Sequence, residues 1–280
     1  PENVGQSDAM RTQDGSRWRL LMRWIGQNEP RARTMGDVTE AVAVAFFADQ
    51  RTHTSPKTLN DYVRVYRRVW RLNGCAENPW MKIRRLKRIS HLRRALSDEE
   101  VARLIGTARG ELRVMFAVGA YTGLRMSDCA HVRWEDFDRT LQTVMVTPSK
   151  TRHSTGRAVA IPVHPSLRKI LGAGDGRTGY VMPELARVDE HRLSRIVMRH
   201  IRDCGFEEPV AVEGFRHRVP VVGFHSLRST FITNMANIGA PMAMVQAIVG
   251  HMTPEMSLHY YRANAEAARA RIEALPGYGI

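Results

Sequence analysis

Apolar residues recur at helical spacing along most of this chain, and one short stretch follows the alternating pattern of strands instead. Residues 141–147 and 158–163 alternate and are rich in β-branched side chains, which is typical of two strands joined by a turn. The pattern therefore predicts a mainly α fold with a small antiparallel β-sheet. Helical spacing is found from Arg17 to about Arg88, and then at 98–109, 111–121, 165–171, 189–203, 225–238 and 241–249.

Local helix signals divide the chain into two predicted domains. Ser55-Pro56 is typical of a helix start, with a cap followed by a proline in the first turn. A basic stretch runs from Met81 to Arg94 without an acidic residue, and residues 97–100 form a capping box for the next helix. We therefore predict a helical domain over residues 1–90 and an α+β domain over residues 91–280.

The chain is strongly basic in both predicted domains. It has 42 lysines and arginines against 28 acidic residues, a formal net charge of +14, and residues 1–90 contain 17 of the basic and 9 of the acidic side chains. This surplus favours a polyanion as partner. No apolar run reaches about 18 residues, and no signal-peptide pattern opens the chain, so DNA is favoured over a membrane and the cytoplasm is the expected compartment. A basic surface that only keeps the protein dissolved is the alternative.

Metal and dinucleotide motifs are not recognisable in this sequence. Cys75, Cys129 and Cys204 are widely spaced and have no CxxC partner, which argues against zinc ligation and against a disulfide framework. The GxGxxG pattern at 174–179 follows a helix-like run where a strand would be required, so we predict a surface loop there. The expectation is no metal and no cofactor.

Two short motifs, far apart in the sequence, carry side chains suited to binding a phosphate. His225 and Arg228 are three residues apart in a helix-like segment, so both side chains leave the same face. Arg125 follows Gly123 at the expected start of another helix, where unpaired N–H groups and the helix dipole favour anions. Asp128 is placed to orient the guanidinium of Arg125. Because arginine matches phosphate oxygens with a planar fork and histidine adds a donor or a base, the motifs predict a phosphate site.

The order of these motifs resembles that of the tyrosine recombinase family, also called phage integrases. The elements are TGLR with an acidic residue three positions on, then HSLR, then Val249-Gly250-His251, and then a tyrosine nine residues after that histidine. No single element is specific for this family, whereas the four elements in this order are highly specific for it. The chain departs from the commonest pattern at Asp128, where glutamate is more frequent, and at Ser229, where histidine is common. The residues that match the family site are Arg125, Lys150, His225, Arg228, His251 and Tyr260, with Asp128 in support.

The resemblance implies a metal-free reaction in which Tyr260 becomes esterified to a DNA phosphate. Arg125 and Arg228 would clamp the two non-bridging oxygens of the transition state and supply the stabilisation that a metal ion provides elsewhere. The expected product is a 3′-phosphotyrosyl link and a free 5′ hydroxyl, and strand exchange would proceed through a Holliday junction. Tyr261 is the alternative nucleophile.

The remaining family positions imply proton transfer and further phosphate contacts. Lys150 stands just after the first predicted strand, where the family places its catalytic lysine, and it would protonate the leaving 5′ oxygen. Lys169, the only other lysine after residue 90, lies in a helical segment. His225 would act as a base or as a phosphate donor, and His251 would donate a hydrogen bond to the phosphate.

The resemblance also implies the architecture on DNA. A helical core-binding bundle and a catalytic domain would form a C-shaped clamp on double-stranded core recombination sites, with a homo-tetramer on paired sites and accessory DNA-bending proteins as candidate partners. A helix at 263–275 would dock onto a neighbouring subunit or pack on its own domain. A solvated helix face and a flexible linker are the alternatives for the candidate DNA-binding residues, which are Arg64, Arg67, Arg68, Arg71, Lys82, Arg84, Arg85, Lys87, Arg88, Arg93 and Arg94.

Three functions are compatible with these residues. A site-specific DNA recombinase, or integrase, is favoured because HSLR followed by GH looks like a recombinase. A type IB DNA topoisomerase uses similar chemistry on one duplex, and a catalytically silent DNA-binding regulator would bind without cutting. Residues 204–223 fit an irregular hairpin or a segment that reaches DNA through Arg216, His217 and Arg218. We expect no arm-binding domain before Arg17, although a chain that opens on Pro1 is compatible with a fragment.

Overall fold

The computed structural model describes residues 8–87, 93–149, 156, 158–172, 176–206, 209–211 and 218–250. The chain forms two compact units. The first contains Pro1–His91 and Val210–Val219, and the second contains Leu92–Pro209 and Pro220–Ile280. Among the described residues, no helix is both long enough and apolar enough to cross a membrane.

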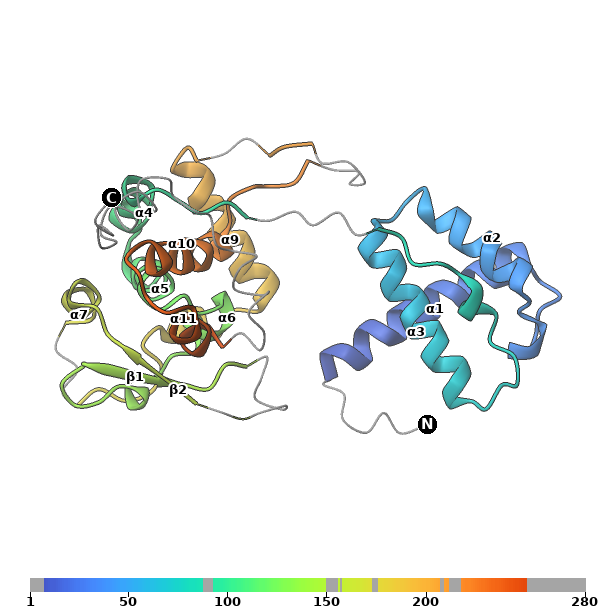
Figure 1. Ribbon diagram of the computed structural model, residues 1–280, viewed down its shortest axis with the longest axis horizontal. Helices are drawn as coiled ribbons and strands as arrows, with labels where there is room; N and C mark the ends of the chain where they lie inside the picture. The colour runs from blue at the N-terminus through green and yellow to red at the C-terminus, as the bar shows by residue number, and fades with distance from the viewer. Residues whose placement is uncertain are drawn as a thin grey trace, which may run out of the picture. The chain divides into compact units, whose positions relative to one another are not determined.

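The first unit is a helical bundle (Figure 1). Two of its helices begin at polar caps: Thr39 accepts a hydrogen bond from the backbone of Val42, and Ser55 accepts one from Thr58. The predicted helix start at Ser55-Pro56 is thus observed, whereas the first helix begins well before Arg17. The elements are α1 (Asp8–Asn28), the 3₁₀ turn η1 (Met35–Asp37), α2 (Glu40–Arg51), α3 (Pro56–Leu72) and the 3₁₀ turn η2 (Pro79–Lys82).

Aromatic side chains fill the core of the first unit. The Trp80 ring lies 4.6 Å from the ring of Tyr66, 5.7 Å from that of Trp70 and 5.8 Å from that of Phe46, measured between centroids. All four side chains are fully buried. The Tyr66 hydroxyl donates to the backbone oxygen of Arg17 over 2.9 Å, and burial raises the pKa of Tyr66 far above its ordinary value. This core fixes α3 against α1 and η2.

The second unit has a helical core with a two-stranded sheet at its edge (Figure 1). Strands β1 (Thr143–Val146) and β2 (Val159–Pro162) pair antiparallel, with Thr143 opposite Pro162 and Val146 opposite Val159. The predicted mainly α fold with a small antiparallel sheet is confirmed. The helices are α4 (Asp98–Thr107), α5 (Gly110–Thr122), α6 (Met126–Ala130), α7 (Pro165–Leu171), α8 (Pro183–Ala186), α9 (Glu190–Asp203), α10 (Phe224–Asn237) and α11 (Met242–Val249), with the 3₁₀ turn η3 at Trp134–Asp136.

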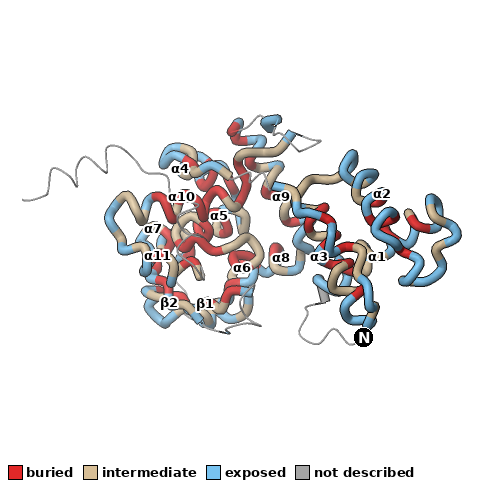
Figure 2. The backbone as a smooth tube through the Cα atoms, turned by 45° about the vertical axis from the view of Figure 1, so that its right-hand side comes forward, coloured by how far each residue is buried: buried red, intermediate tan, exposed pale blue. Residues whose placement is uncertain are grey.

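The centre of the second unit is the contact between α5 and α10, which Figure 2 shows as largely buried backbone. Gly119 makes this contact possible: a Cβ at that position would lie 2.7 Å from Cζ of Phe224 and 3.1 Å from Cδ1 of Leu227. The missing side chain lets the two helices approach closely. The close approach sets the start of α10 beside α5, and both helices lead into the candidate site.

Two loops behave as the sequence indicates. Gly176 and Gly179 have positive φ, and Tyr180 forms a β-bridge with Arg133, so the described part of the GxGxxG stretch, residues 176–179, has the backbone of a turn. Val210 and Val219 form an antiparallel bridge with backbone hydrogen bonds of 3.0 and 2.8 Å, which agrees with an irregular hairpin within 204–223. Arg216 and His217 lie outside the described residues.

Candidate active site

Arg125 is presented by a glycine turn at the end of α5. Gly123 ends the helix in the left-handed conformation, with φ of 64°, and Arg125 then occupies the N-cap of α6. A Cβ on Gly123 would meet Cδ1 of Phe231, on α10, at 2.7 Å. The turn therefore needs glycine both for its backbone conformation and for its contact with α10.

Asp128 connects Arg125 to the end of the sheet. Its Oδ2 lies 3.8 Å from Nη1 of Arg125, and its Oδ1 accepts a hydrogen bond of 2.9 Å from the backbone N–H of Ser149. The side chain is 4% exposed, so this carboxylate interacts with little competition from water. Asp128 thus holds both the guanidinium and the residue that immediately precedes Lys150. Lys150 itself lies outside the described residues.

Arg228 is buried, with 1% of its surface exposed. It donates from Nη1 to the backbone oxygen of Gly123 over 2.8 Å and from Nη2 to that of Val249 over 2.5 Å. Its guanidinium therefore joins α10 to the turn that precedes Arg125 and to the end of α11. Gly250 ends α11 in the left-handed conformation, immediately before His251. His251, Tyr260, Tyr261 and the segment 263–275 lie outside the described residues.

His225 stands in the first turn of α10, one turn before Arg228, and it is partly exposed. The helix predicted for this segment is observed, so the two side chains share the same helical stretch at the spacing that places them on one face. Arg125, Asp128 and Arg228 are thus brought together around the Gly123 turn, whereas His225 is placed only by its position on the same helix as Arg228. They come from α6 and α10, which are distant in sequence.

The electrostatics of this cluster favour an anion. Nη1 of Arg125 is buried, and within the described part of the chain it has no hydrogen-bond partner. A buried donor without a partner is costly, about 1–3 kcal/mol, and an anion would remove this penalty. Two guanidinium groups at one turn, with a single carboxylate beside one of them, can stabilise the charge that develops on a phosphate.

Three predicted DNA-binding residues of the first unit also stabilise its own fold. Arg67 donates to the backbone oxygens of Trp80, Met81 and Ile83, at 2.9, 3.1 and 2.7 Å, and desolvation lowers its pKa, with a smaller effect from Arg85. Arg68 pairs with Asp14. The Lys82 ammonium lies 2.6 Å from Glu40, and this hydrogen bond raises the pKa of the lysine.

The two described arginines at the end of the basic stretch pack onto the second unit. Arg93 donates to the backbone oxygens of Pro220 and Val222, the latter over 2.8 Å. Arg94 forms a two-pronged pair with Glu100, at 2.7 Å for each contact. Their assignment to DNA stays a prediction, and the contacts give both residues a structural role. Arg88 lies outside the described residues.

The other described residues of the first unit that are predicted to bind DNA are exposed. They include Arg84, Arg85 and Lys87. A hollow of about 570 Å³ is lined by arginines of α3 together with the chain that follows η2. Its basic lining consists of Arg64, Arg67, Arg68, Arg71 and Arg85.

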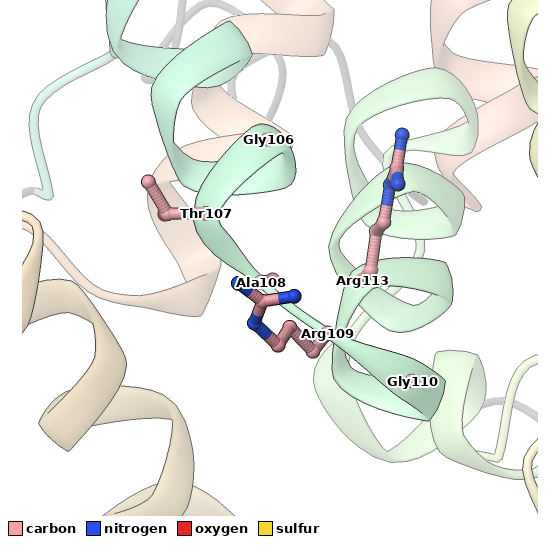
Figure 3. Close-up of a pocket in the computed structure, with 6 residues that line it drawn as sticks. All are labelled: Gly106, Thr107, Ala108, Arg109, Gly110 and Arg113. Carbon is pink, nitrogen blue, oxygen red and sulfur yellow. The ribbon is translucent and has the colours of Figure 1, made fainter.

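Two basic features of the second unit are missed by the sequence analysis. Four arginines of α9 form an exposed row, and their spacing of three, four and three residues is the signal that could have identified them. A pocket of about 590 Å³ lies where α4 meets α5, lined by Arg109 and Arg113 (Figure 3). Because Arg125 follows the opposite end of α5, this pocket is separated from the candidate active site by about 20 Å of helix.

These geometries describe a protein with one buried arginine, Arg228, and one partly exposed arginine, Arg125, at the same turn, an arrangement suited to a phosphodiester. A model of the Phage integrase family matches residues 94–267. The chain belongs to the phage integrase family, and it is a tyrosine recombinase, an enzyme that transfers DNA strands.

Two relatives show how far the similarity extends along the chain. An integrase/recombinase from Escherichia coli is 25% identical over an alignment 303 residues long. The alignment covers 92% of this chain and 86% of the relative. Tyrosine recombinase XerA of Pyrococcus furiosus is 25% identical over 228 residues, which cover 78% of this chain and 74% of the relative.

Two solved structures have the same fold. The Tn1549 transposon integrase in complex with a circular intermediate DNA aligns with a TM-score of 0.69 and 18% identity, over 98% of this chain and 95% of that one. A lambda integrase tetramer bound to a Holliday junction aligns with a TM-score of 0.66 and 19% identity, over 93% of this chain and 73% of that one.

Proposed function

We propose that this recombinase cuts and rejoins DNA through a site made of Arg125, Lys150, His225, Arg228, His251 and Tyr260, with Asp128 in support. The observation that carries the proposal is the junction at Gly123. Arg228 binds the carbonyl of this residue, and Arg125 follows two residues later with a buried Nη1 that lies 3.8 Å from Asp128 and has no hydrogen-bond partner among the described residues. A phosphate is the ligand that both guanidinium groups can share.

The proposed cleavage step exchanges one phosphoester bond for another. The hydroxyl of Tyr260 loses its proton to a base, for which His225 is the candidate, and its oxygen attacks the phosphorus. The bond from phosphorus to the 5′ oxygen breaks, and Lys150 gives a proton to that oxygen. The strand then carries a 3′-phosphotyrosyl link and a free 5′ hydroxyl. Attack of a 5′ hydroxyl on this link reverses the exchange and reseals a strand.

The charge clamp makes this displacement feasible. The free phenol titrates near ~10, so Tyr260 is a weak nucleophile until it loses its proton. Arg125 and Arg228 bind the non-bridging oxygens more strongly as negative charge builds on them, which lowers the barrier. His251, directly after α11, adds a hydrogen bond from the segment that Arg228 holds through Val249. Asp128 orients Arg125 and holds the backbone of Ser149, the residue before Lys150.

The two parts of the chain have different roles in the proposed reaction. Residues 1–90 bind the core recombination site and residues 91–280 carry the chemistry, acting on double-stranded DNA in the cytoplasm. A homo-tetramer on paired sites passes through a Holliday junction, with accessory DNA-bending proteins as further partners. The lambda integrase tetramer bound to a Holliday junction supports this arrangement through its shared fold.

A nicked suicide substrate tests the proposal, because loss of the short downstream strand traps the covalent complex. We expect wild-type protein and the Tyr261→Phe control to form the adduct and Tyr260→Phe to form none while it retains DNA binding. Adduct formation by Tyr260→Phe, with none by Tyr261→Phe, would move the nucleophile to the neighbouring tyrosine.

Further assays on the wild-type protein distinguish a recombinase from a type IB topoisomerase and from a DNA-binding regulator. Site selection from random DNA, followed by a two-site joining assay, is expected to give a preferred sequence and recombinant products. Plasmid relaxation without site dependence would identify a type IB topoisomerase instead. Binding without any covalent product would identify a regulator.

A further inference from the structure

Arg93 is bound to the segment that leads into α10. Its guanidinium donates from Nη1 to the backbone oxygens of Pro220 and Val222, the latter over 2.8 Å. Gly223 follows as the N-cap of α10, and a Cβ at that position would lie 3.2 Å from Cζ of Arg93. The backbone of Gly223 is extended, with φ of −172°, so the close approach of the guanidinium is what the missing side chain allows.

The main chain of Arg93 is also joined to α10. Its carbonyl oxygen lies 3.4 Å from Oγ of Ser229, and the same hydroxyl lies 3.3 Å from the carbonyl oxygen of His225. Ser229 is buried, and a buried hydroxyl needs a hydrogen-bond partner. Arg93 therefore holds the chain before His225 with its side chain and the helix after His225 with its main chain.

Residues 94–96 are fastened to the same part of the second unit. The backbone N–H of Arg94 donates to the carbonyl oxygen of Val221 over 2.9 Å. The backbone N–H of Leu96 donates to Oγ1 of Thr230, on α10, over 2.7 Å, and both of these residues are buried. These bonds fix the register of the chain along α10, so the Arg93 guanidinium is brought back to the same carbonyl oxygens.

We propose that Arg93 is a positioning residue that sets the place of His225 in the active site. The inference rests on the proposed function, in which His225 is the candidate base. His225 is the second residue of α10, so its place follows the path of the chain through Val222 and the N-cap. A base works only within hydrogen-bond reach of the proton that it takes, and Arg93 fixes that path without taking part in the chemical step.

A positioning role differs measurably from the DNA contact that the basic stretch suggests. The guanidinium of Arg93 is bound to carbonyl oxygens of its own chain, and one of them belongs to the fully buried Val222. A contact with a DNA phosphate contributes to the salt dependence of DNA affinity, whereas a positioning contact does not. The rate of cleavage on bound DNA and the affinity for DNA therefore separate the two roles.

The test compares Arg93→Ala with Arg177→Ala, a control with the same loss of charge. Arg177 donates to the backbone oxygen of Leu171 over 3.3 Å and lies over the Trp134 ring, so the control also loses an arginine-to-carbonyl bond of the second unit. Adduct formation is measured in single turnover on the nicked substrate at saturating DNA, and affinity is measured over a range of salt concentrations.

The expected result is a loss of rate without a loss of binding. A displacement of about 1 Å in a reacting group can cost about a hundredfold, so we expect Arg93→Ala to form the adduct roughly ten- to a hundredfold more slowly. Its DNA affinity and salt slope should match those of Arg177→Ala, which should cut at a near-wild-type rate.

A double variant decides whether the loss passes through His225. Arg93→Ala/His225→Gln should be no slower than His225→Gln alone, because a base that has been removed cannot be misplaced. Additive losses would show that Arg93 acts elsewhere and would overturn the inference. Arg93→Lys keeps the charge but not the planar fork, so its rate should be intermediate, and it takes the place of Arg93→Ala in this comparison if the alanine variant does not fold.

The remaining outcomes also decide the inference. An Arg93→Ala variant that cuts as fast as the control overturns it, and so does a shallower salt slope, which would assign Arg93 to a DNA phosphate. No adduct from the wild-type protein would remove the proposed function and the inference with it, and normal cutting by His225→Gln would remove the inference together with the role of that histidine. A wild-type adduct and a slow His225→Gln beside a normal Arg93→Ala remove the inference alone.

Discussion

Arg228 donates a hydrogen bond of 2.8 Å to the backbone oxygen of Gly123, and Gly123 stands two residues before Arg125. The same guanidinium reaches the carbonyl of Val249, two residues before His251. One buried side chain thus connects three segments that carry residues of the proposed phosphate site. In the proposed site, Arg228 would therefore have two roles, holding these segments together and supplying positive charge to the phosphate.

Replacing Arg228 with lysine should lower both activity and stability. Lysine cannot reproduce the fork, so the buried carbonyls of Gly123 and Val249 lose partners, and we expect the free energy of unfolding to fall by about 2 kcal/mol or more. Urea denaturation and the rate of adduct formation measure the two effects. Arg125→Lys is the matched variant: it should lose activity on the order of a hundredfold but keep near-wild-type stability. Equal stability of the two variants would contradict the dual role.

Gly123→Ala should lower stability and adduct formation by more than backbone strain alone, because the added Cβ also clashes with Phe231. Gly123 has φ of 64°, and an added Cβ would lie 2.7 Å from Phe231. Gly176→Ala provides the control, because Gly176 has φ of 74° with no atom within 4 Å of its Cβ position. Left-handed strain of about 1–2 kcal/mol should appear in both variants, with a further loss and reduced adduct formation only for Gly123→Ala. Thermal unfolding of the two proteins makes the comparison.

Substitutions of Asp128 should separate its two contacts. Asparagine retains an oxygen for the Ser149 N–H but removes the charge beside Arg125, whereas alanine removes both. We expect slower adduct formation for Asp128→Asn and a larger loss for Asp128→Ala, since alanine also leaves the strand end before Lys150 without its anchor. Single-turnover cleavage measures the difference. Identical rates for the two variants would show that the Ser149 contact does not contribute.

Glu100 should make stability depend on pH in the acid range. The hydrogen bond from Arg94 lowers the pKa of this carboxyl below its ordinary value of 4.5, against a smaller opposing effect of burial. A depressed pKa gives stability that is complete above the unfolded value and is lost as pH falls through the folded one. Because the pair is partly exposed, we expect Glu100→Gln to lose only about 0.5–1 kcal/mol at neutral pH. Denaturation at several pH values should show this difference vanish in acid; a constant difference would argue against the ion pair.

The sequence predicts the features that depend on neighbouring residues. The Ser55-Pro56 helix start and the Ser97 capping box are observed because a cap is a contact between residues three positions apart. The phosphate motifs are also local: Gly123 and Arg125 stand in one turn, and His225 and Arg228 in another. The family resemblance, and neither motif alone, predicts that the two segments lie close together, whereas the hydrogen bond from Arg228 to the Gly123 carbonyl is a finding of the structure.

Features that depend on distant partners are not predictable in this way. Ala45 fits the helical spacing of α2 but is exposed, and Ala43 is buried instead, because the packing of α2 decides which face is covered. Arg68 looks like a solvated cation in sequence, yet it pairs with Asp14, which lies 54 residues away. Charge patterns therefore identify a basic protein without identifying which cations are already occupied within the fold.

The most direct test of the shared phosphate clamp is a structure of the protein trapped covalently on a nicked duplex. The account predicts one phosphate joined to Tyr260 and contacted by the guanidinium groups of both Arg125 and Arg228, with Arg228 still near Gly123. A phosphate attached elsewhere, or one that touches neither arginine, would contradict it.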